Sequence, residues 1–223
     1  MEAIILAGGQ GKRLKPITDY VPKPLVPLDN IPIIEWQIKY LKKFGVDKIV
    51  ICSGYKAQMI QNYLSVKNNK GLEIKFSNEK TPLGTGGAIR QAGNLIQNES
   101  FIVINGDIIT NIDLKKLLEI PNSIAAIELR TKFGIMDTSE TKVIKFTEKK
   151  AIPEIWMNAG IYHLKKNILK VLPKKGDIEK TIFPEYAKKG LLNTVKFRNV
   201  DWFSIDSLKD IEECSLKIRK IIK

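Results

Sequence analysis

A short apolar run near the start of the chain leads directly into a glycine-rich, basic turn. Residues 3–7 read Ala-Ile-Ile-Leu-Ala, and the turn that follows contains Gly8, Gly9, Gly11, Lys12 and Arg13. Glycines let the backbone turn tightly and bring N–H groups close to an anion, and the two cations add positive charge. Lys23, between two prolines, adds a third cation nearby in the sequence. The pattern predicts a buried strand that ends in a phosphate-binding loop.

Two common phosphate-binding motifs do not fit this turn. In the dinucleotide-binding motif a third glycine opens a helix, but Leu14 takes that position and Pro16 follows. In the Walker motif Ser or Thr follows Gly-Lys, whereas Arg13 follows it here. A surface turn with incidental lysines is the alternative, and later segments that point to the same chemistry weigh against it.

Hydrophobic periodicity predicts alternating strands and helices over the first half of the chain. The expected strands are 3–7, 48–53, 72–77 and 100–104, and the expected helices are 32–44, 57–64 and 85–96. This alternation is typical of an α/β fold with a mostly parallel, mixed central sheet between two helical layers. We expect a Rossmann-like α/β/α architecture with ligands at the carboxyl ends of the strands.

The alternation loosens after about residue 120. Strands are expected near 124–129, 143–147, 156–164 and 194–197, and helices near 178–188 and 207–222. Asp177 and Ser207 are the candidate N-caps of these two helices, and Leu208 is expected on the packed face of the second. No interior linker or repeat is visible, so residues 1–223 are expected to form a single domain.

The net charge of +13, from 37 Lys and Arg against 24 Asp and Glu, would suit nucleic acid or an anionic membrane. The basic residues are spread along the chain in pairs, without an aromatic-rich RNA motif. We therefore expect a basic, solvated surface, with no nucleic-acid and no membrane partner. A nucleic-acid-binding protein is the alternative that charge alone favours.

Several features bear on the compartment. Cys52 and Cys214 make neither a disulfide framework nor a zinc site, and no apolar stretch approaches the roughly 20 residues of a membrane span. The N-terminus begins a strand rather than a basic segment followed by a cleavage site. The expectation is a cytoplasmic protein that is a monomer or a homodimer.

The first loop and its Pro-Lys-Pro segment resemble the signature of the sugar-1-phosphate nucleotidyltransferases, also called nucleotide-sugar pyrophosphorylases. Four more segments resemble that family in the same order: a second nucleotide loop at 81–88, a metal-binding turn at 105–107, and sugar-side segments at 146–149 and 158–160. Together the five segments extend along nearly all of the chain. The loop Glu-x-x-Pro-Leu-Gly-Thr-Gly-Gly is also similar to short guanylyltransferases that act on mannose or heptose 1-phosphate.

The resemblance implies a nucleoside triphosphate and a sugar 1-phosphate as substrates and Mg²⁺ as cofactor. A sugar-phosphate oxygen would attack the α-phosphorus and release pyrophosphate, and this nucleophile is already an anion at pH 7. No general base is needed, so His163, inside a predicted strand, is expected to be structural. What the reaction needs is charge stabilisation, and Arg13 and Lys23 are the predicted catalytic residues.

The same resemblance predicts the nucleotide contacts, which are Leu6, Ala7, Gly8, Gly9, Gly11, Pro82, Gly84 and Thr85. Glu79 is the candidate for base selection, where relatives that take thymine or uracil often carry Gln. An ionised carboxylate only accepts hydrogen bonds, and guanine offers two adjacent donors, N1–H and N2–H₂. GTP is therefore the predicted nucleotide. The alternatives are a glucose-1-phosphate thymidylyl- or uridylyltransferase, and Glu79 as a solvent-facing residue.

On the sugar side, the resemblance points to Gly134, Glu148, Lys149 and Asn158. Glu148 can accept hydrogen bonds from two hydroxyls and Lys149 can bind the sugar phosphate. The family's Glu-Lys-Pro is Glu148-Lys149-Lys150 here, which would also pass as a charged turn.

The predicted metal site contains one clear ligand and one departure from the family pattern. Asp107 follows a buried strand and offers a hard oxygen to Mg²⁺. Many relatives read Trp-x-Asp-Ile-Gly, but here Ser204 takes the aspartate position and Asp206 the glycine position. Either Asp206 reaches the metal, or Ser204 holds it through water, or Asp206 only caps the last helix; Asp206 is the predicted ligand. A catalytically idle, nucleotide-sugar-binding regulatory homologue is the alternative that Ser204 favours.

Overall fold

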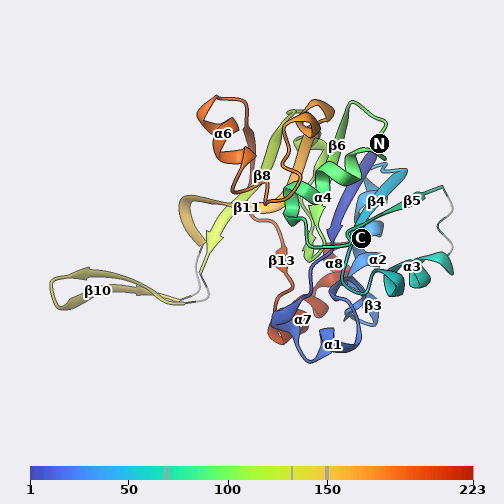
Figure 1. The fold of residues 1–223 in the computed structure, drawn as a ribbon. Helices are drawn as coiled ribbons and strands as arrows, with labels where there is room; N and C mark the ends of the chain where they lie inside the picture. Colours follow the sequence, from blue (N-terminus) through green and yellow to red (C-terminus); the bar gives the residue numbers. More distant parts are fainter. Residues whose placement is uncertain (68, 70, 132, 149–150, 223) are drawn as a thin grey trace.

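The fold is that of a computed structural model, which describes residues 1–67, 69, 71–131, 133–148 and 151–222. A seven-stranded sheet with the order β12-β8-β11-β6-β1-β4-β5 forms its centre (Figure 1). In this sheet β11 runs antiparallel to its neighbours β6 and β8, and the other pairings are parallel. The predicted mixed, mostly parallel sheet is confirmed. Its strands are β1 (Glu2–Ala7), β4 (Lys48–Ser53), β5 (Glu73–Asn78), β6 (Ser100–Asn105), β8 (Ser123–Arg130), β11 (Ala151–Lys165) and β12 (Asn193–Phe197).

Helices cover both faces of the sheet because successive side chains of each buried strand point to opposite faces. Ala3 and Ile5 of β1 belong to a core shared with α2, α3 and α5. Ile4, between them, belongs to a core shared with α4 and α6. The predicted three layers are therefore present. The helices are α2 (Ile33–Lys43), α3 (Ala57–Ser65), α4 (Gly84–Gly93), α5 (Leu114–Leu118) and α6 (Ile182–Lys188).

A third apolar cluster lies beyond the carboxyl end of the sheet and brings the two ends of the chain together. Leu14 and Val26 from the first loops pack there with Ile109 and Ile205. Ser204 pairs with Ile108 in a short antiparallel ladder, so the segment around residue 206 lies beside the turn after β6. The elements here are β2 (Pro27–Leu28), β3 (Ile31–Pro32), β7 (Ile108–Thr110), β13 (Trp202–Ser204), α1 (Ile17–Tyr20), α7 (Leu208–Ser215) and α8 (Ile218–Ile221).

Some predicted elements differ in the structure. The helix expected from 178 begins only at Ile182, and Asp177 does not cap it because its carboxylate accepts from the N–H of Thr85. The helix expected over 207–222 is two helices, and Leu208 is exposed rather than packed. The Ser207 cap is confirmed, since its Oγ accepts from the N–H of Asp210. Strands β7 and β13 were too short to be predicted from periodicity.

A two-stranded hairpin projects from the body of the molecule (Figure 1). It consists of β9 (Ile135–Ser139), which the sequence analysis did not predict, and β10 (Lys142–Thr147). Several of its apolar side chains are exposed, among them Met136, Val143, Ile144 and Phe146. This hairpin therefore lacks the apolar cover that both faces of the central sheet have.

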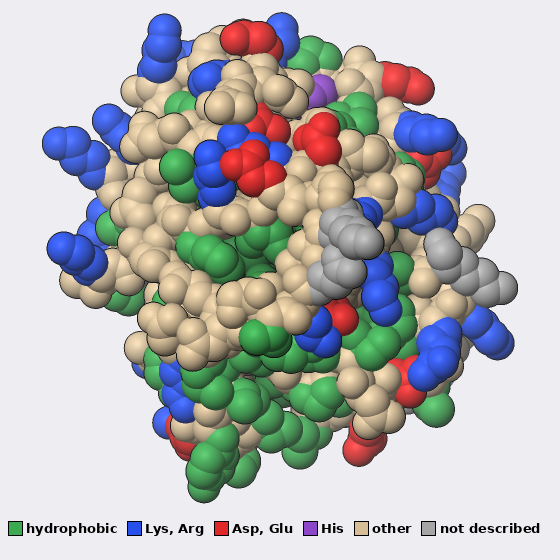
Figure 2. All heavy atoms as spheres, turned by 90° about the vertical axis from the view of Figure 1, so that its right-hand side faces the viewer, with side chains coloured by type: hydrophobic (Ala, Val, Ile, Leu, Met, Phe, Trp, Pro, Cys, Tyr) green, Lys and Arg blue, Asp and Glu red, His purple; other side chains and the backbone are tan. Residues whose placement is uncertain are grey.

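Lysine and arginine side chains lie at separate points on the face drawn in Figure 2, with acidic side chains between them. This face shows no single basic stripe of the kind that follows a nucleic-acid backbone. Among the described residues, no helix combines the length and the apolar character needed to cross a membrane. Cys52 and Cys214 are buried and unpaired, as predicted.

Candidate functional site

A cavity of about 450 Å³ opens at the carboxyl ends of β1 and β6, which is within the usual range for a ligand site. The sheet brings the two predicted nucleotide loops, both predicted catalytic cations and both predicted metal ligands to its wall. The predicted residues that line it are Leu6, Ala7, Gly8, Gly9, Gly11, Arg13, Lys23, Glu79, Pro82, Gly84, Thr85, Asp107 and Asp206.

The first loop is held by a backbone conformation that favours glycine. Gly11 has a φ of 61°, and a Cβ there would lie 2.9 Å from Cγ2 of Thr18. The Thr18 hydroxyl donates to the Gly11 carbonyl at 3.0 Å. A 3₁₀ turn (Lys12–Leu14) follows, with Leu14 buried as an anchor and Arg13 largely exposed. The loop thus presents Arg13 to the cavity from a fixed base.

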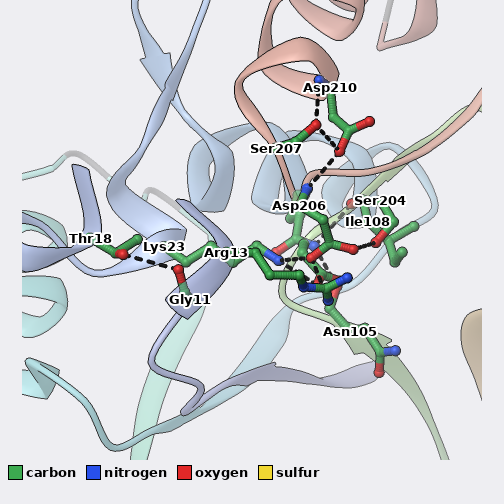
Figure 3. Close-up of polar contacts among 12 residues, drawn as sticks. Gly11, Arg13, Thr18, Lys23, Asn105, Ile108, Ser204, Asp206, Ser207 and Asp210 are labelled. Atoms are coloured by element: carbon green, nitrogen blue, oxygen red, sulfur yellow. Dashed lines mark hydrogen bonds and ion pairs between the residues drawn. The ribbon is translucent and has the colours of Figure 1, made fainter. Parts of the chain in front are cut away.

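Lys23 lies at the centre of an ion cluster (Figure 3). Its Nζ is 2.7 Å from Oδ2 of Asp107 and 2.8 Å from Oδ1 of Asp206. The Arg13 guanidinium is also 2.8 Å from Oδ1 of Asp206. The Lys23 side chain is only 13% exposed, whereas that of Arg13 is 75% exposed. Two carboxylates, one from the middle and one from the C-terminal part of the chain, therefore converge on one largely buried ammonium group.

Asp206 is held in place by its neighbours in the sequence. The Ser204 hydroxyl donates to Oδ2 of Asp206 at 3.0 Å, and the Asp206 N–H donates to the Asp210 carboxylate at 3.1 Å. Burial alone would raise the pKa of the Asp206 carboxyl, but Lys23, Ser204 and Arg13 together hold that pKa below its usual range. Since Ser207 caps α7, the alternative in which Asp206 caps that helix is wrong.

The turn that carries Asp107 is fixed against β1 and α2. The Gly106 N–H donates to the Leu6 carbonyl at 2.9 Å. The buried amide of Gln37 donates to the carbonyls of Asn105 and Ile108, at 2.8 and 3.0 Å. The turn can therefore hold its carboxylate in one place without any ligand.

Glu79 forms part of the cavity wall rather than facing solvent. Its Oε2 accepts from the Leu83 N–H at 2.9 Å, and a Cβ on Gly8 would lie 2.6 Å from its Oε1. The side chain is half-buried, and this burial raises the pKa of the carboxyl despite the hydrogen bond from Leu83. One carboxylate oxygen thus fixes the second loop, while the other faces the first.

The second loop is held by backbone hydrogen bonds to a segment about 90 residues further along the chain. The Gly86 and Gly87 N–H groups both donate to the Gly176 carbonyl, at 2.9 and 3.2 Å, and the Gly176 N–H donates to the Leu83 carbonyl at 2.7 Å. Gly84 has a φ of 74°, and a Cβ there would lie 2.7 Å from the Gly176 carbonyl. The approach of the two backbones therefore requires glycine at this position.

Of the predicted sugar-side residues, the three that the structure describes do not line the cavity. Gly134, just before β9, and Glu148, just after β10, lie at the same end of the hairpin, because Ile135 pairs with Thr147; the side chain of Glu148 is exposed. Asn158 is exposed on β11, where its Oδ1 accepts from the Gly160 N–H at 2.8 Å. Lys149 lies outside the described residues. His163 is buried, with Nδ1 3.1 Å from the Ile120 carbonyl oxygen, which fits the predicted structural role.

Sequence reasoning missed Gln37, Gly176 and Glu179, all of which contact residues of the site. Each contacts a segment more than 60 residues away, so no local pattern pointed to its partner. Asp177, next to Gly176, was predicted only as a helix cap.

In chemical terms, the cavity combines hard carboxylate oxygens with two cations. This combination suits a polyanionic ligand whose charge must be neutralised. Among the residues that the structure describes, no group of three or more His, Cys, Asp or Glu side chains could hold a metal ion by itself. A cation here would therefore be shared between the two aspartates and a ligand.

A model of the family described as nucleotidyl transferase matches residues 2–221, and the chain therefore belongs to that family. The D-glycero-alpha-D-manno-heptose 1-phosphate guanylyltransferase of Aneurinibacillus thermoaerophilus is 39% identical over 176 residues, or 75% of this chain and 76% of that protein. A mannose-1-phosphate guanylyltransferase catalytic subunit beta of Dictyostelium discoideum is 34% identical over 227 residues, or 94% of this chain and 62% of that protein.

A solved structure is also similar to the whole chain. HddC from Yersinia pseudotuberculosis, complexed with GMP-PN, has a TM-score of 0.76 at 30% identity and covers 97% of this chain, and this chain covers 98% of it. The predicted resemblance to the sugar-1-phosphate nucleotidyltransferases is confirmed. The prediction that the protein is an enzyme of that class is confirmed with it.

Proposed function

We propose that the protein transfers a guanylyl group from GTP to a heptose- or mannose-type sugar 1-phosphate. The observation that carries the proposal is that one cavity holds both Glu79 and the cluster of Lys23, Arg13 and two aspartates. The guanylyltransferases similar to this chain, and the GMP-PN complex of HddC, support the same choice of nucleotide.

Glu79 supplies the reason for guanine. The N1–H and N2–H₂ groups of guanine are adjacent donors that match an ionised carboxylate. Thymine and uracil offer one donor between two carbonyl acceptors, and the carboxylate would repel those acceptors. Because Glu79 is already fixed by the Leu83 N–H, little ordering is needed when the base binds.

The reaction follows from charge placement. An oxygen of the sugar phosphate attacks the α-phosphorus, a new P–O bond forms, and the bond to the bridging oxygen breaks so that pyrophosphate leaves with its electron pair. No proton has to be removed. Arg13 and Lys23 would stabilise the charge that builds up on the transferred phosphoryl group and on the pyrophosphate.

Mg²⁺ belongs to the same proposal. Asp107 and Asp206 already share a cation, the Lys23 ammonium, so their hard oxygens and their charge fit a divalent ion. These two carboxylates would hold the ion, which when bound would neutralise phosphate charge. Lys23 would then leave the carboxylates and be available to a phosphate oxygen. Many relatives carry the second carboxylate at the position of Ser204, and in this proposal Asp206 supplies it instead. The presence of a second carboxylate argues against a catalytically idle homologue.

A matrix assay tests the proposal directly. Purified protein with Mg²⁺ is incubated with GTP, dTTP, UTP, CTP or ATP and with a panel of sugar 1-phosphates, and pyrophosphate release is measured. The expected result is release with GTP and a heptose or mannose 1-phosphate. Release only with dTTP or UTP and glucose 1-phosphate would support the thymidylyl- or uridylyltransferase alternative, and no release with any pair would favour the regulatory homologue.

A further inference from the structure

A row of hydrogen-bonded side chains joins the second nucleotide loop to β11. The Thr85 hydroxyl donates to Oε2 of Glu179, and the Tyr162 hydroxyl donates to Oε1 of the same carboxylate at 3.0 Å. The Asn158 amide donates to the Tyr162 hydroxyl oxygen at 2.9 Å. The two oxygens of Glu179 therefore accept one hydroxyl from the second nucleotide loop and one from β11.

The middle of this row is rigid. Tyr162 is fully buried, and its ring packs edge-to-face on Phe183 with centroids 5.0 Å apart. Burial, followed by the nearby Glu179 carboxylate, raises the pKa of the Tyr162 phenol, which keeps it a neutral donor. In a buried network of this kind, removing one member leaves its partners without hydrogen bonds, so the members hold one common arrangement.

The two ends of the row lie at different parts of the proposed site. Thr85 lines the cavity and also accepts from the Ile178 N–H at 3.0 Å. Asn158 is exposed on β11, two residues before Gly160. A Cβ added at Gly160 would lie 2.7 Å from the side-chain amide of Asn105, so the backbone approaches that side chain closely there. Thr85 faces the cavity and Asn158 is exposed, so a ligand can reach both ends, whereas Glu179 between them does not line the cavity and accepts from one hydroxyl on each side.

We propose that Glu179 and Tyr162 are positioning residues that couple the nucleotide side of the site to the sugar side. A nucleotide that fixes Thr85 also fixes the Glu179 carboxylate, the Tyr162 hydroxyl and, through it, the side-chain amide of Asn158. This inference rests on the proposed function, because it assigns Asn158 to the sugar phosphate. Neither Glu179 nor Tyr162 touches a substrate.

Tyr162→Phe removes one hydroxyl and keeps the ring that packs on Phe183. The measurement is calorimetric binding of mannose 1-phosphate, or of the sugar phosphate that the matrix assay selects, with and without a GTP analogue whose α–β bridge cannot be cleaved. We expect the wild-type protein to bind the sugar phosphate about tenfold more tightly with the analogue present, and we expect this factor to fall to about one in Tyr162→Phe. Because such coupling is reciprocal, Tyr162→Phe should weaken binding of the analogue to the sugar-phosphate-bound protein by the same factor, while binding of the analogue to the free protein stays within about twofold.

A second variant and a matched control separate positioning from simple stability. Glu179→Gln keeps the shape but offers one acceptor oxygen in place of two, so it should lose the coupling in the same way. Tyr40→Phe removes the hydroxyl of another buried tyrosine, which donates to the Ile112 carbonyl at 2.7 Å outside the cavity. It should lower the melting temperature to a similar extent and leave the coupling factor unchanged.

Three results would overturn the inference. The first is a wild-type coupling factor of one, and the second is an unchanged factor in folded, active Tyr162→Phe and Glu179→Gln proteins. The third is an equal loss of coupling in Tyr40→Phe, because the effect would then come from general destabilisation. Wild-type protein that releases no pyrophosphate with any substrate pair would instead contradict the proposed function.

Discussion

The nucleotide side of the cavity is held by contacts between distant segments, whereas the predicted sugar-side residues lie largely on an exposed hairpin. Lys23 bridges Asp107 and Asp206, and the loop at Gly176 clasps the start of α4. Gly134 and Glu148, by contrast, lie at the ends of two strands whose apolar side chains are open to solvent. One half of the proposed site is therefore assembled in the free protein, and the other half contributes little to the cavity wall.

A preassembled site costs less ordering when its ligand binds, and it can be aimed at charge that develops in the transition state. An open segment can still add contacts that select among ligands. We therefore expect changes on the nucleotide side to act mainly on kcat. Changes on the hairpin should act on the KM for the sugar phosphate.

Asp107→Asn should have the largest effect. The amide keeps the shape of the side chain but removes the charge that holds Lys23 and, in the proposed function, a divalent cation. We expect kcat to fall by about 10³-fold with little change in melting temperature, measured as pyrophosphate release. Asp113→Asn is the matched control, because Asp113 only caps α5 and Asn caps about as well. Unchanged activity and Mg²⁺ dependence in Asp107→Asn would move the metal site elsewhere.

Lys23→Ala should affect catalysis and metal binding in opposite directions. Loss of the ammonium should lower kcat by about 10²-fold, as should Arg13→Ala, because both are proposed to stabilise phosphoryl charge. Without the ammonium between Asp107 and Asp206, however, Mn²⁺ should bind the free protein more tightly, which electron paramagnetic resonance titration can measure.

Lys15→Ala is the control for this pair of effects. Lys15 lies in the chain between Arg13 and Lys23, and it forms an ion pair with Asp19 outside the cavity. Its removal therefore takes away a nearby cation that does not face the two carboxylates. Weaker Mn²⁺ binding by Lys23→Ala than by wild type would show that the ammonium does not compete for the two carboxylates.

The residues just described also show how far the sequence leads toward the site. Lys23 and Asp107 were predicted from short motifs together with the resemblance to the family, and the structure places both at the cavity wall. Asp206 was predicted over Ser204 only because one carboxylate looked insufficient for the site. The pairing of Ser204 with Ile108 and the hydrogen bond that the Ser204 hydroxyl donates to Asp206 place Asp206 at the cavity, and neither is visible in the order of residues.

The same contrast between local and long-range information separates the predicted from the unpredicted parts of the fold. The strand at 48–53 is buried throughout, and its apolar run was recognised with its exact bounds. Residues 135–139 form a strand without a buried face, so hydrophobic periodicity carried no signal for them. The hydrogen bond from the Gly176 N–H to the Leu83 carbonyl joins segments far apart in the chain, so no local pattern pointed to it.

Ser204→Ala tests how much the function of Asp206 depends on its hydrogen bond from Ser204. The Ser204 hydroxyl donates to Oδ2 of Asp206, so its loss should loosen that carboxylate without removing its charge. We expect kcat to fall by about tenfold and the Mg²⁺ concentration for half-maximal rate to rise. Asp206→Asn should have a larger effect in the same direction. Equal, near-normal Mg²⁺ responses in both variants would mean that Asp107 and the substrate phosphates alone hold the cation.

Glu79 predicts a pH dependence of nucleotide binding. Burial raises the pKa of this carboxyl above its ordinary value of 4.5, so its protonated fraction grows as the pH falls toward that raised value. Only the ionised form accepts from both guanine donors, so the KM for GTP should rise by several-fold between about pH 7 and about pH 5. Glu79→Gln should have a higher, pH-independent KM. The same slope in Glu79→Gln would assign the titration to another group.

The hairpin should give the smallest effect, confined to one substrate. Glu148→Gln keeps the size of an exposed side chain but weakens it as an acceptor of sugar hydroxyls, so the KM for the sugar phosphate should rise by about threefold while kcat and the KM for GTP stay unchanged. Asp137→Asn is the control. It removes a charge on β9 of the same hairpin, away from the end that carries Glu148, and should leave both KM values and kcat unchanged. If Glu148→Gln lowered kcat by as much as Ser204→Ala does, the hairpin would belong to the catalytic side of the site, and the division between an assembled half and an open half would fail.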